Sequence, residues 1–271
     1  MRKTRGKLFA YAILTISGFI MVFPFLWMIS TSLKTGVDIY NPSIIPKTVT
    51  FNNYIRVIEN SNFLLWFKNS LIVAAITTLS VLWFDSLVGY TFSKLPFKGK
   101  KFLFIMILST MMIPTEMLII PWYMMSNNNG WLNTYWSLLF PGLSSAFGIF
   151  MMRQFFTGVP NDLLEAGRID GLSEFGIFIK TALPLVKPAL SALGIFTFLG
   201  NWNAFLWPVI AVDKTDIYTL PVGLALFSGE SYNQWDLVMA AASLATIPVL
   251  IVFFIFQKQI IEGIHMTGLK A

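Results

Sequence analysis

The sequence predicts an all-α, polytopic membrane protein with six transmembrane helices and both termini in the cytoplasm. Hydrophobic residues form 56% of the 271 residues and charged residues only 12%, whereas soluble proteins carry about 25% charged residues. Apolar runs long enough to cross a bilayer recur along the chain, with basic residues between alternate pairs of runs. We therefore expect an integral, multi-pass protein of the cell membrane.

The first predicted span is the apolar run from Leu8 to about Ser30, which follows the basic segment MRKTRGK. It corresponds to roughly 35 Å of helix, enough to cross a bilayer. A cleaved signal peptide would have a shorter apolar region, about 7 to 15 residues, and a small-residue cleavage site that is missing here. The run is therefore interpreted as a retained span. Residues 31–66 are interpreted as an external loop with an amphipathic helix near Asn53–Ile58.

Five further spans are predicted from the length of their apolar runs. They are residues 67–92, 102–125, 137–156, 189–212 and 237–260. We expect one domain over residues 1–271, with its core spans within 67–260.

The distribution of Lys and Arg predicts the orientation of these spans. With a cytoplasmic amino terminus, all but five of the nineteen Lys and Arg residues lie on the cytoplasmic side. The five are Lys34, Lys47, Arg56, Lys68 and Lys214. Because basic residues accumulate in short cytoplasmic loops, both termini and the segment 160–188 are predicted to be cytoplasmic. The net charge of +6 is thus a topology signal, and no nucleic-acid partner is expected.

The segment 160–188 is the one long polar insert among the apolar runs. It begins with Pro160 and Asn161, typical helix-start residues, and Gly171 can take the left-handed conformation that ends a helix. Ser173 offers a second N-cap, and Glu174–Ala182 can form a second helix before the prolines at 184 and 188 break the chain. The segment therefore predicts two short helices hinged at Gly171.

This segment resembles the EAA signature of the permease subunits of ABC importers. The matching residues are Glu165, Ala166, Gly171, Leu183 and Pro184, and the departures are Gly167 where Ala is usual and Thr181 where Ile is usual. Other motifs resemble the carbohydrate-importing branch, in particular its maltose-type second permease. They are SLKT at 32–35, NSLIVA at 69–74, MMIPTEMLIIP at 111–121, LNTYWSL at 132–138, GIFMMRQFF at 148–156, NWNAFLWP at 201–208 and YTLPVGL at 218–224.

The resemblance implies the ABC type I importer permease fold and a transmembrane permease subunit. Such a subunit translocates a sugar or oligosaccharide that an extracytoplasmic sugar-binding protein delivers. The implied partners are that binding protein, a second homologous permease subunit, two cytoplasmic ATP-binding subunits and the lipid bilayer. ATP and Mg would be used by the ATP-binding subunits.

The chain itself is not expected to be an enzyme or to bind a cofactor or metal. It lacks GxxxxGK[ST], HExxH and GxSxG motifs, has no cysteine, and has one histidine, His265.

By the same resemblance, the segment 160–188 is the cytoplasmic coupling loop. The residues assigned to ATPase coupling are Leu163, Leu164, Glu165, Ala166, Gly167, Arg168, Ile169, Asp170 and Gly171. Glu165 is expected to contact either a basic group of the ATPase subunit or Arg168 as an i,i+3 pair. The apolar docking surface is expected from Leu163, Leu164 and Ile169, and Asp170 is expected to cap or contact at the hinge.

Polar side chains within the predicted spans are candidates for a substrate path, namely Asp85, Asn201, Asn203 and Trp207. A charge at the bilayer centre costs at least about 2.5 to 3.5 kcal/mol, so Asp85 either lines the cavity, pairs with a partner subunit or is a satisfied structural carboxylate. Amides beside indoles are typical of sugar sites. Alternatively, the tryptophans form an interfacial belt and the asparagines bridge helices.

An ion-coupled secondary transporter is the alternative function. Such a protein would show inverted repeats and usually more spans, and neither is found. A membrane enzyme would need clustered ionisable groups, whereas Asp85 and Glu116 are isolated in the sequence. Glu116 lies between two prolines, and we interpret it as a structural partner for backbone groups that a broken helix frees.

Overall fold

The computed structural model describes residues 2–230 and 234–268, and within these ranges it contains helices and no strand. The all-α prediction is confirmed. Residues 1, 231–233 and 269–271 of the predicted single domain lie outside the described residues. The contacts divide the chain into two compact units: unit 1 is Met1–Leu65 with Gly223–Pro248, and unit 2 is Trp66–Val222 with Val249–Ala271.

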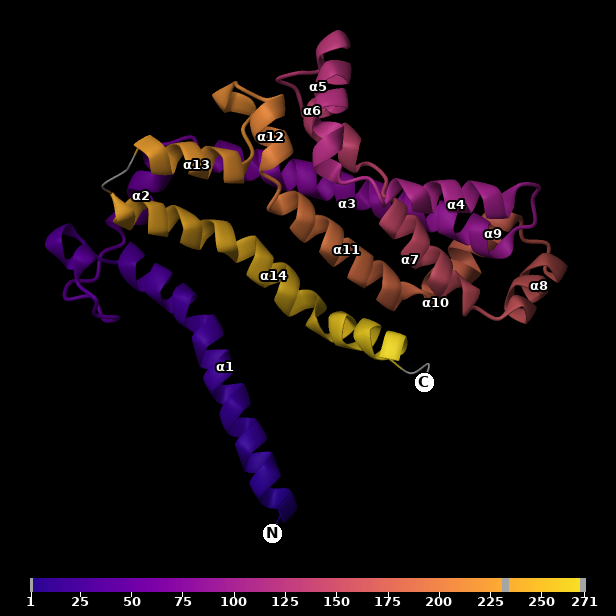
Figure 1. The fold of residues 1–271 in the computed structure, drawn as a ribbon, viewed down its shortest axis with the longest axis horizontal. Helices are drawn as coiled ribbons and strands as arrows, with labels where there is room; N and C mark the ends of the chain where they lie inside the picture. The colour runs from indigo at the N-terminus through magenta and orange to yellow at the C-terminus, as the bar shows by residue number, and fades with distance from the viewer. Residues whose placement is uncertain (1, 231–233, 269–271) are drawn as a thin grey trace. The chain divides into compact units, whose positions relative to one another are not determined.

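Three helices contain continuous stretches long and apolar enough to cross a membrane. They are α1 (Arg2–Ser32), α3 (Phe63–Lys94) and α14 (Trp235–Gly268) (Figure 1). Three further candidates are bent pairs of helices, with bends of 91°, 41° and 83° at their breaks. The described residues thus contain three spans, or up to six if each bent pair is counted as one. The sidedness of these spans stays a prediction.

The bent pairs are built from shorter helices. The first two pairs are α4 (Lys100–Thr110) with η2 (Thr115–Leu118) and α5 (Ile119–Asn128), and α6 (Tyr135–Leu139) with η3 (Phe140–Gly142) and α7 (Ala146–Thr157). The third pair joins α9 (Glu174–Ile177), the π-helical η4 (Phe178–Ala182) and α10 (Leu183–Leu185) to α11 (Lys187–Trp202). Within unit 2, α12 packs against α5 and α6.

The remaining elements are short or lie in the connections. They are η1 (Gly36–Tyr40), α2 (Asn52–Glu59), α8 (Asn161–Ile169), α12 (Leu206–Ala211), η5 (Thr215–Ile217) and α13 (Leu220–Glu230). The helix expected near Asn53–Ile58 is confirmed by α2.

Three predicted spans and one predicted helix end differ from the structure. The predicted spans 102–125 and 137–156 are not single helices, because they lie on the first two bent pairs. The predicted span 189–212 is wrong as a single helix, because α11 ends at Trp202 and α12 begins at Leu206. Pro208 lies in the first turn of α12, where its missing N–H costs no helical bond. Pro184 does not end the second hairpin helix, which continues to Leu185 after the π-helical η4.

The core of unit 2 joins α3, α7 and η4. Three buried rings pack together there, with centroids 5.4 Å apart for Tyr90 and Phe156, and 5.3 Å apart for Tyr90 and Phe178. At Gly89, the residue before Tyr90, α3 and α7 approach so closely that a Cβ would lie 2.8 Å from the Cβ of Met152. Hence α7 is fixed against α3, and η4 against both.

In unit 1, buried polar side chains fold the loop after α1 against the end of that helix. Lys34 is fully buried, and its Nζ donates to the carbonyls of Asn41 and Ser43 at 2.9 and 2.6 Å. Asn53 of α2 donates to the carbonyls of Ser32 and Lys34 at 2.8 and 2.9 Å. These bonds satisfy backbone acceptors that burial would otherwise leave unpaired.

Candidate functional site

The candidate site is the hairpin of α8 and α9, and a glycine turn joins its two helices. The N–H of Leu172 bonds to the carbonyl of Gly167 at 3.0 Å, and the N–H of Gly171 bonds to the carbonyl of Arg168 at 3.1 Å. This pair of bonds is the Schellman motif, which needs a left-handed residue at Gly171. Gly171 has φ +78°, so the predicted conformation is confirmed. Asp170 is the C-cap residue of α8.

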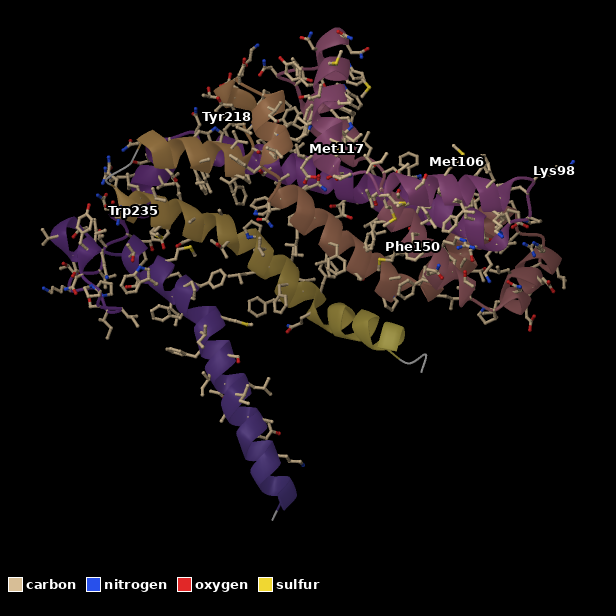
Figure 2. All side chains as sticks on the ribbon, in the orientation of Figure 1. Lys98, Met106, Met117, Phe150, Tyr218 and Trp235 are labelled. Atoms are coloured by element: carbon tan, nitrogen blue, oxygen red, sulfur yellow. The ribbon has the colours of Figure 1, made fainter. Side chains whose placement is uncertain are left out.

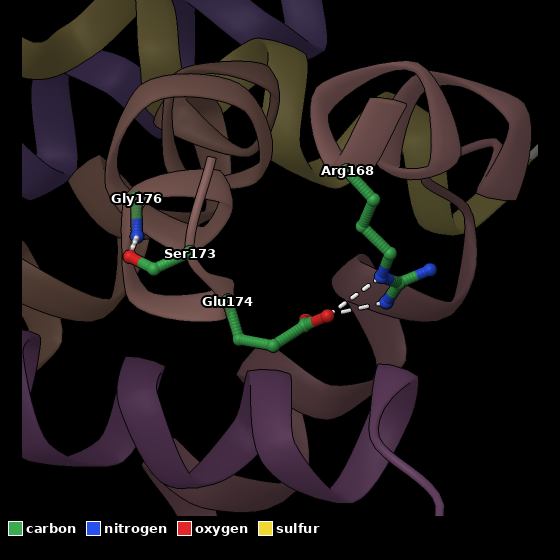
Figure 3. Close-up of polar contacts among 4 residues, drawn as sticks. All are labelled: Arg168, Ser173, Glu174 and Gly176. Carbon is green, nitrogen blue, oxygen red and sulfur yellow. Dashed lines mark hydrogen bonds and ion pairs between the residues drawn. The ribbon is translucent and has the colours of Figure 1, made fainter. Parts of the chain in front are cut away.

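A serine cap starts the second helix of the hairpin. The Oγ of Ser173 accepts from the N–H of Gly176 at 3.1 Å (Figure 3), as the sequence predicted. From α9 the helix runs through η4, whose Phe178 lies in the core of unit 2. Through these residues the hairpin is anchored to the membrane helices of its own unit.

A bidentate salt bridge closes the hairpin across the turn. Arg168 Nε and Nη2 donate to the Glu174 carboxylate oxygens at 2.6 and 3.2 Å (Figure 3). The hydrogen bonds from Arg168 lower the pKa of the Glu174 carboxyl and, reciprocally, that carboxylate raises the pKa of Arg168. Of the two contacts expected for Glu165, the i,i+3 salt bridge with Arg168 is not formed among the described residues, because Arg168 reaches across the turn to Glu174. The charge of Glu165 still contributes to the raised pKa of Arg168.

The two faces of α8 differ in exposure, and this corrects part of the predicted docking surface. Leu163 and Ile169 are 45% and 86% exposed, but Leu164 is only 2% exposed and belongs to the core of unit 2. Including Leu164 in that surface was wrong, since its side chain packs inward. Ala166 and Glu165 are exposed.

Gly167, one of the two departures from the EAA signature, lies on the buried face of α8. A Cβ at this position would lie 3.2 Å from Cγ1 of Ile177, a contact tighter than most. The glycine therefore allows α8 and α9 to pack closely, and its role is in the shape of the hairpin.

Asp85 of α3 is fully buried and bound to the start of α7. Its carboxylate accepts from Ser144 Oγ at 2.7 Å, from Ser145 Oγ at 2.9 Å and from the Ser145 N–H at 3.0 Å. Ser145 is the N-cap of α7, and its Oγ accepts from the Gly148 N–H at 2.9 Å. This geometry matches the satisfied structural carboxylate among the three alternatives for Asp85.

The other candidates for a substrate path each bond to a backbone carbonyl. Asn201 and Asn203 donate to the carbonyls of Thr197 and Leu199 in their own helix, both at 2.9 Å. Trp207 Nε1 donates to the carbonyl of Ser137 at 2.7 Å. Both asparagine bonds run back to carbonyls of α11, so they do not bridge helices as the alternative expected, whereas the Trp207 bond joins α12 to α6. The amide oxygen of the exposed Asn203 has no hydrogen bond among the described residues.

Glu116 lies in η2 between the two halves of the first bent pair. Its side chain is exposed, and among the described residues it accepts no hydrogen bond from freed backbone groups. The expected structural pairing of Glu116 within this chain is therefore wrong.

Comparison with known proteins identifies the family. Residues 85–265 match the profile of the binding-protein-dependent transport system inner membrane components. The chain belongs to this family. The match spans both the Asp85 contact and the α8–α9 hairpin, and the resemblance to carbohydrate ABC permeases is confirmed. The protein is thus a multi-pass inner-membrane transport component, which replaces the alternative of an ion-coupled secondary transporter.

Several relatives are similar over nearly their full length. The arabinooligosaccharides transport system permease protein AraQ of Halalkalibacterium halodurans is 35% identical, with 93% of this chain and 92% of AraQ covered. The lactose transport system permease protein LacG of Rhizobium radiobacter is 31% identical, with 97% and 96% covered. The trehalose/maltose transport system permease protein MalG of Thermococcus litoralis is 33% identical, with 93% and 92% covered.

Solved structures show the same fold. A crystal structure of a bacterial ABC transporter involved in the import of the acidic polysaccharide alginate matches with a TM-score of 0.85 at 25% identity, covering 95% of this chain and 98% of that chain. A second, of the alginate transporter in complex with an alginate pentasaccharide-bound periplasmic protein, matches with a TM-score of 0.69 at 13% identity, covering 93% of each chain. The ABC importer permease fold is therefore confirmed.

Two residues at the hairpin make contacts that were not predicted from the sequence. Glu174 is the partner of Arg168, six positions away across the turn, and Lys94 at the end of α3 bonds to the start of α8. A left-handed Gly171 between Arg168 and Glu174 was a usable signal, because a Schellman turn reverses the chain and brings its flanks together. No local signal connects Lys94 with a residue 67 positions away.

Proposed function

We propose that the chain is the transmembrane permease subunit of an ATP-driven ABC importer for a sugar or oligosaccharide. Its partners in this proposal are an extracytoplasmic solute-binding protein, a second homologous permease subunit and two cytoplasmic ATP-binding subunits. The observation that carries the proposal is the near full-length similarity to permease proteins named for arabinooligosaccharides, lactose and trehalose/maltose.

In this proposal ATP and Mg bind to the partner subunits, and the hairpin receives their motion. The hairpin is suited to that role because it is small, anchored and closed on itself. The Schellman turn, the Ser173 cap and the Arg168–Glu174 pair hold its two helices together, and Leu164 fixes α8 to the core. A rigid element of this kind transmits a displacement instead of absorbing it.

The surface that would meet an ATP-binding subunit is the exposed side of α8. Leu163 and Ile169 supply apolar contact area, and Glu165 supplies an exposed carboxylate that forms no salt bridge among the described residues. Asp170 lies exposed at the turn. The buried Leu164 and Gly167 would not touch the ATP-binding subunit; their packing sets the position of α8.

Energy coupling can be tested with the complex reconstituted in proteoliposomes. With the solute-binding protein and an oligosaccharide present, uptake is expected with ATP and Mg on the side of the ATP-binding subunits. No uptake is expected from an imposed proton or sodium gradient without ATP. Uptake driven by a gradient alone would overturn the proposal.

The coupling role can be tested with Glu165→Lys. This change is expected to weaken binding of the ATP-binding subunits, or to uncouple ATP hydrolysis from uptake, because it reverses the charge at the proposed interface. Asp213→Lys, at another exposed position, is the control with the same change in charge. Wild-type coupling in Glu165→Lys would show that the hairpin is only a connecting loop.

A further inference from the structure

A polar seam joins the end of α3 to the end of α7 and the start of α8. Arg153 Nε donates to the carbonyl of Phe92 at 3.2 Å, and the hydroxyls of Ser93 and Thr157 lie 3.2 Å apart. Lys94, the last residue of α3, completes the seam. Three consecutive residues of α3 thus contact the chain that leads into the hairpin.

Lys94 makes the contact that reaches α8 itself. Its Nζ donates to the carbonyl of Val159 at 2.6 Å and to Oδ1 of Asn161 at 2.8 Å. Val159 follows the end of α7, where helix carbonyls lack partners and a cation is favoured. Asn161 is the first residue of α8, whose N-cap, Pro160, makes no side-chain cap bond. One ammonium group therefore links the end of α3, the end of α7 and the start of α8.

Away from Lys94, α3 and α7 are also held tightly together. Asp85 binds Ser144 and Ser145, and the close approach at Gly89 leaves no room for a side chain between the helices. Because α7 cannot slide along α3, a displacement of α8 at the seam has to move α3 as well.

We propose that Lys94 is a positioning residue that makes α8 and α3 move as one body. This inference rests on the proposed coupling role of the hairpin. The seam carries the displacement of α8 directly into α3, a long span that reaches Asp85. The second route, through η4 and α10 into α11, contains a π-helical segment and a bend of 83°.

The first test uses Lys94→Met in the reconstituted complex with its partner subunits. Methionine keeps most of the apolar stem and removes the ammonium. We expect normal complex yield and ATP hydrolysis, with a several-fold increase in ATP hydrolysed per substrate imported. Lys98→Met is the matched control, because the exposed Lys98 side chain extends from the turn after α3 (Figure 2).

Variants of the acceptor separate positioning from general destabilisation. Asn161→Leu should reproduce the effect of Lys94→Met, whereas Asn161→Asp keeps an oxygen for the ammonium and should couple normally. The double variant Lys94→Met, Asn161→Leu should be no worse than Lys94→Met alone, since Lys94→Met already removes the bond to Asn161. Additive losses would overturn the proposal.

A distance measurement between α3 and α8 tests directly whether the two helices move together. The chain has no cysteine, so spin labels can be attached to cysteines introduced at the exposed Leu79 of α3 and Asp162 of α8. The distance between them should stay constant between the nucleotide-free and ATP-bound complexes, and should change between these states in Lys94→Met. A distance that already changes in the parent complex would refute one-body motion.

The remaining outcomes distinguish this inference from the proposed function. Uncoupling by Glu165→Lys with wild-type behaviour of Lys94→Met would overturn the role of Lys94 alone, because the apolar contacts would suffice. Reduced yield of Lys94→Met with a normal coupling ratio in the surviving complex would show a purely structural role and also overturn it. Wild-type coupling in both variants would mean that the proposed role of the hairpin fails, and this inference with it.

Discussion

Gly148→Ala is expected to break the contact between α3 and α7 from the α7 side. A Cβ built at Gly148 overlaps Oδ2 of Asp85 and lies 2.8 Å from Oγ of Ser145, far inside van der Waals contact. The carboxylate has to move away from the new methyl group. Because Asp85 is fully buried and accepts hydrogen bonds from Ser144 and Ser145, any such movement weakens bonds that water cannot replace.

The magnitude follows from these contacts. Overpacking a buried site costs about 1 to 3 kcal/mol, and a lost hydrogen bond to a charged group costs about 1.5 to 3 kcal/mol. The two costs partly replace each other, since moving the carboxylate relieves the clash, so we expect about 2 to 4 kcal/mol. Gly200→Ala is the matched control in α11, because nothing lies within 4 Å of its Cβ and alanine is better than glycine in a helix by about 0.5 to 1 kcal/mol.

The assay is unfolding of the purified complex in detergent, followed by temperature or denaturant. Gly148→Ala should unfold earlier than the parent and Gly200→Ala should not. Asp85→Ser in the Gly148→Ala background removes the clashing oxygen, so the double variant should be less destabilised than the sum of the single variants by about 0.5 to 3 kcal/mol. Strictly additive effects, or a stable Gly148→Ala, would refute this account of Asp85.

Three other predictions concern the hairpin, the topology and the indole in α12. Gly171→Val should strain the hairpin by about 1 to 2 kcal/mol and uncouple ATP hydrolysis from uptake, whereas Gly171→Asn should be tolerated, because asparagine visits the left-handed region; ATPase and uptake assays with matched complex yields decide this. An impermeant thiol reagent applied to intact cells should label Asn128→Cys and not Lys98→Cys, and the reverse pattern would invert the topology. Lys98 is chosen over the neighbouring Gly99, because the φ of +79° at Gly99 is strained for a cysteine. Trp207→Phe loses one hydrogen bond, worth about 1 kcal/mol, and keeps an aromatic ring; reduced sugar uptake at unchanged thermal stability would indicate direct substrate contact.

Local features of the hairpin could be predicted because the residues that cause them are adjacent in the chain. The left-handed Gly171 and the Ser173 cap each depend on bonds that span a few residues. The helix α2, in the connection after α1, and the apolar runs were likewise local patterns. The positions of the breaks were harder to predict, since Pro208 lies in the first turn of a helix whereas Pro184 follows a π-helical segment within one.

The order of residues is enough to predict that the chain is helical, that its apolar runs can span a membrane, and that a polar hairpin interrupts them. Which side of α8 is buried depends on packing between distant helices, because Leu163 and Leu164 are equally apolar and the core of unit 2 takes only the second. The same packing brings Asp85 to Ser144 and Ser145, which lie about 60 positions away. The composition and periodicity of a segment show how much of it is apolar. The hydrogen-bond donors of a buried charge, in contrast, come from distant helices and depend on how those helices pack.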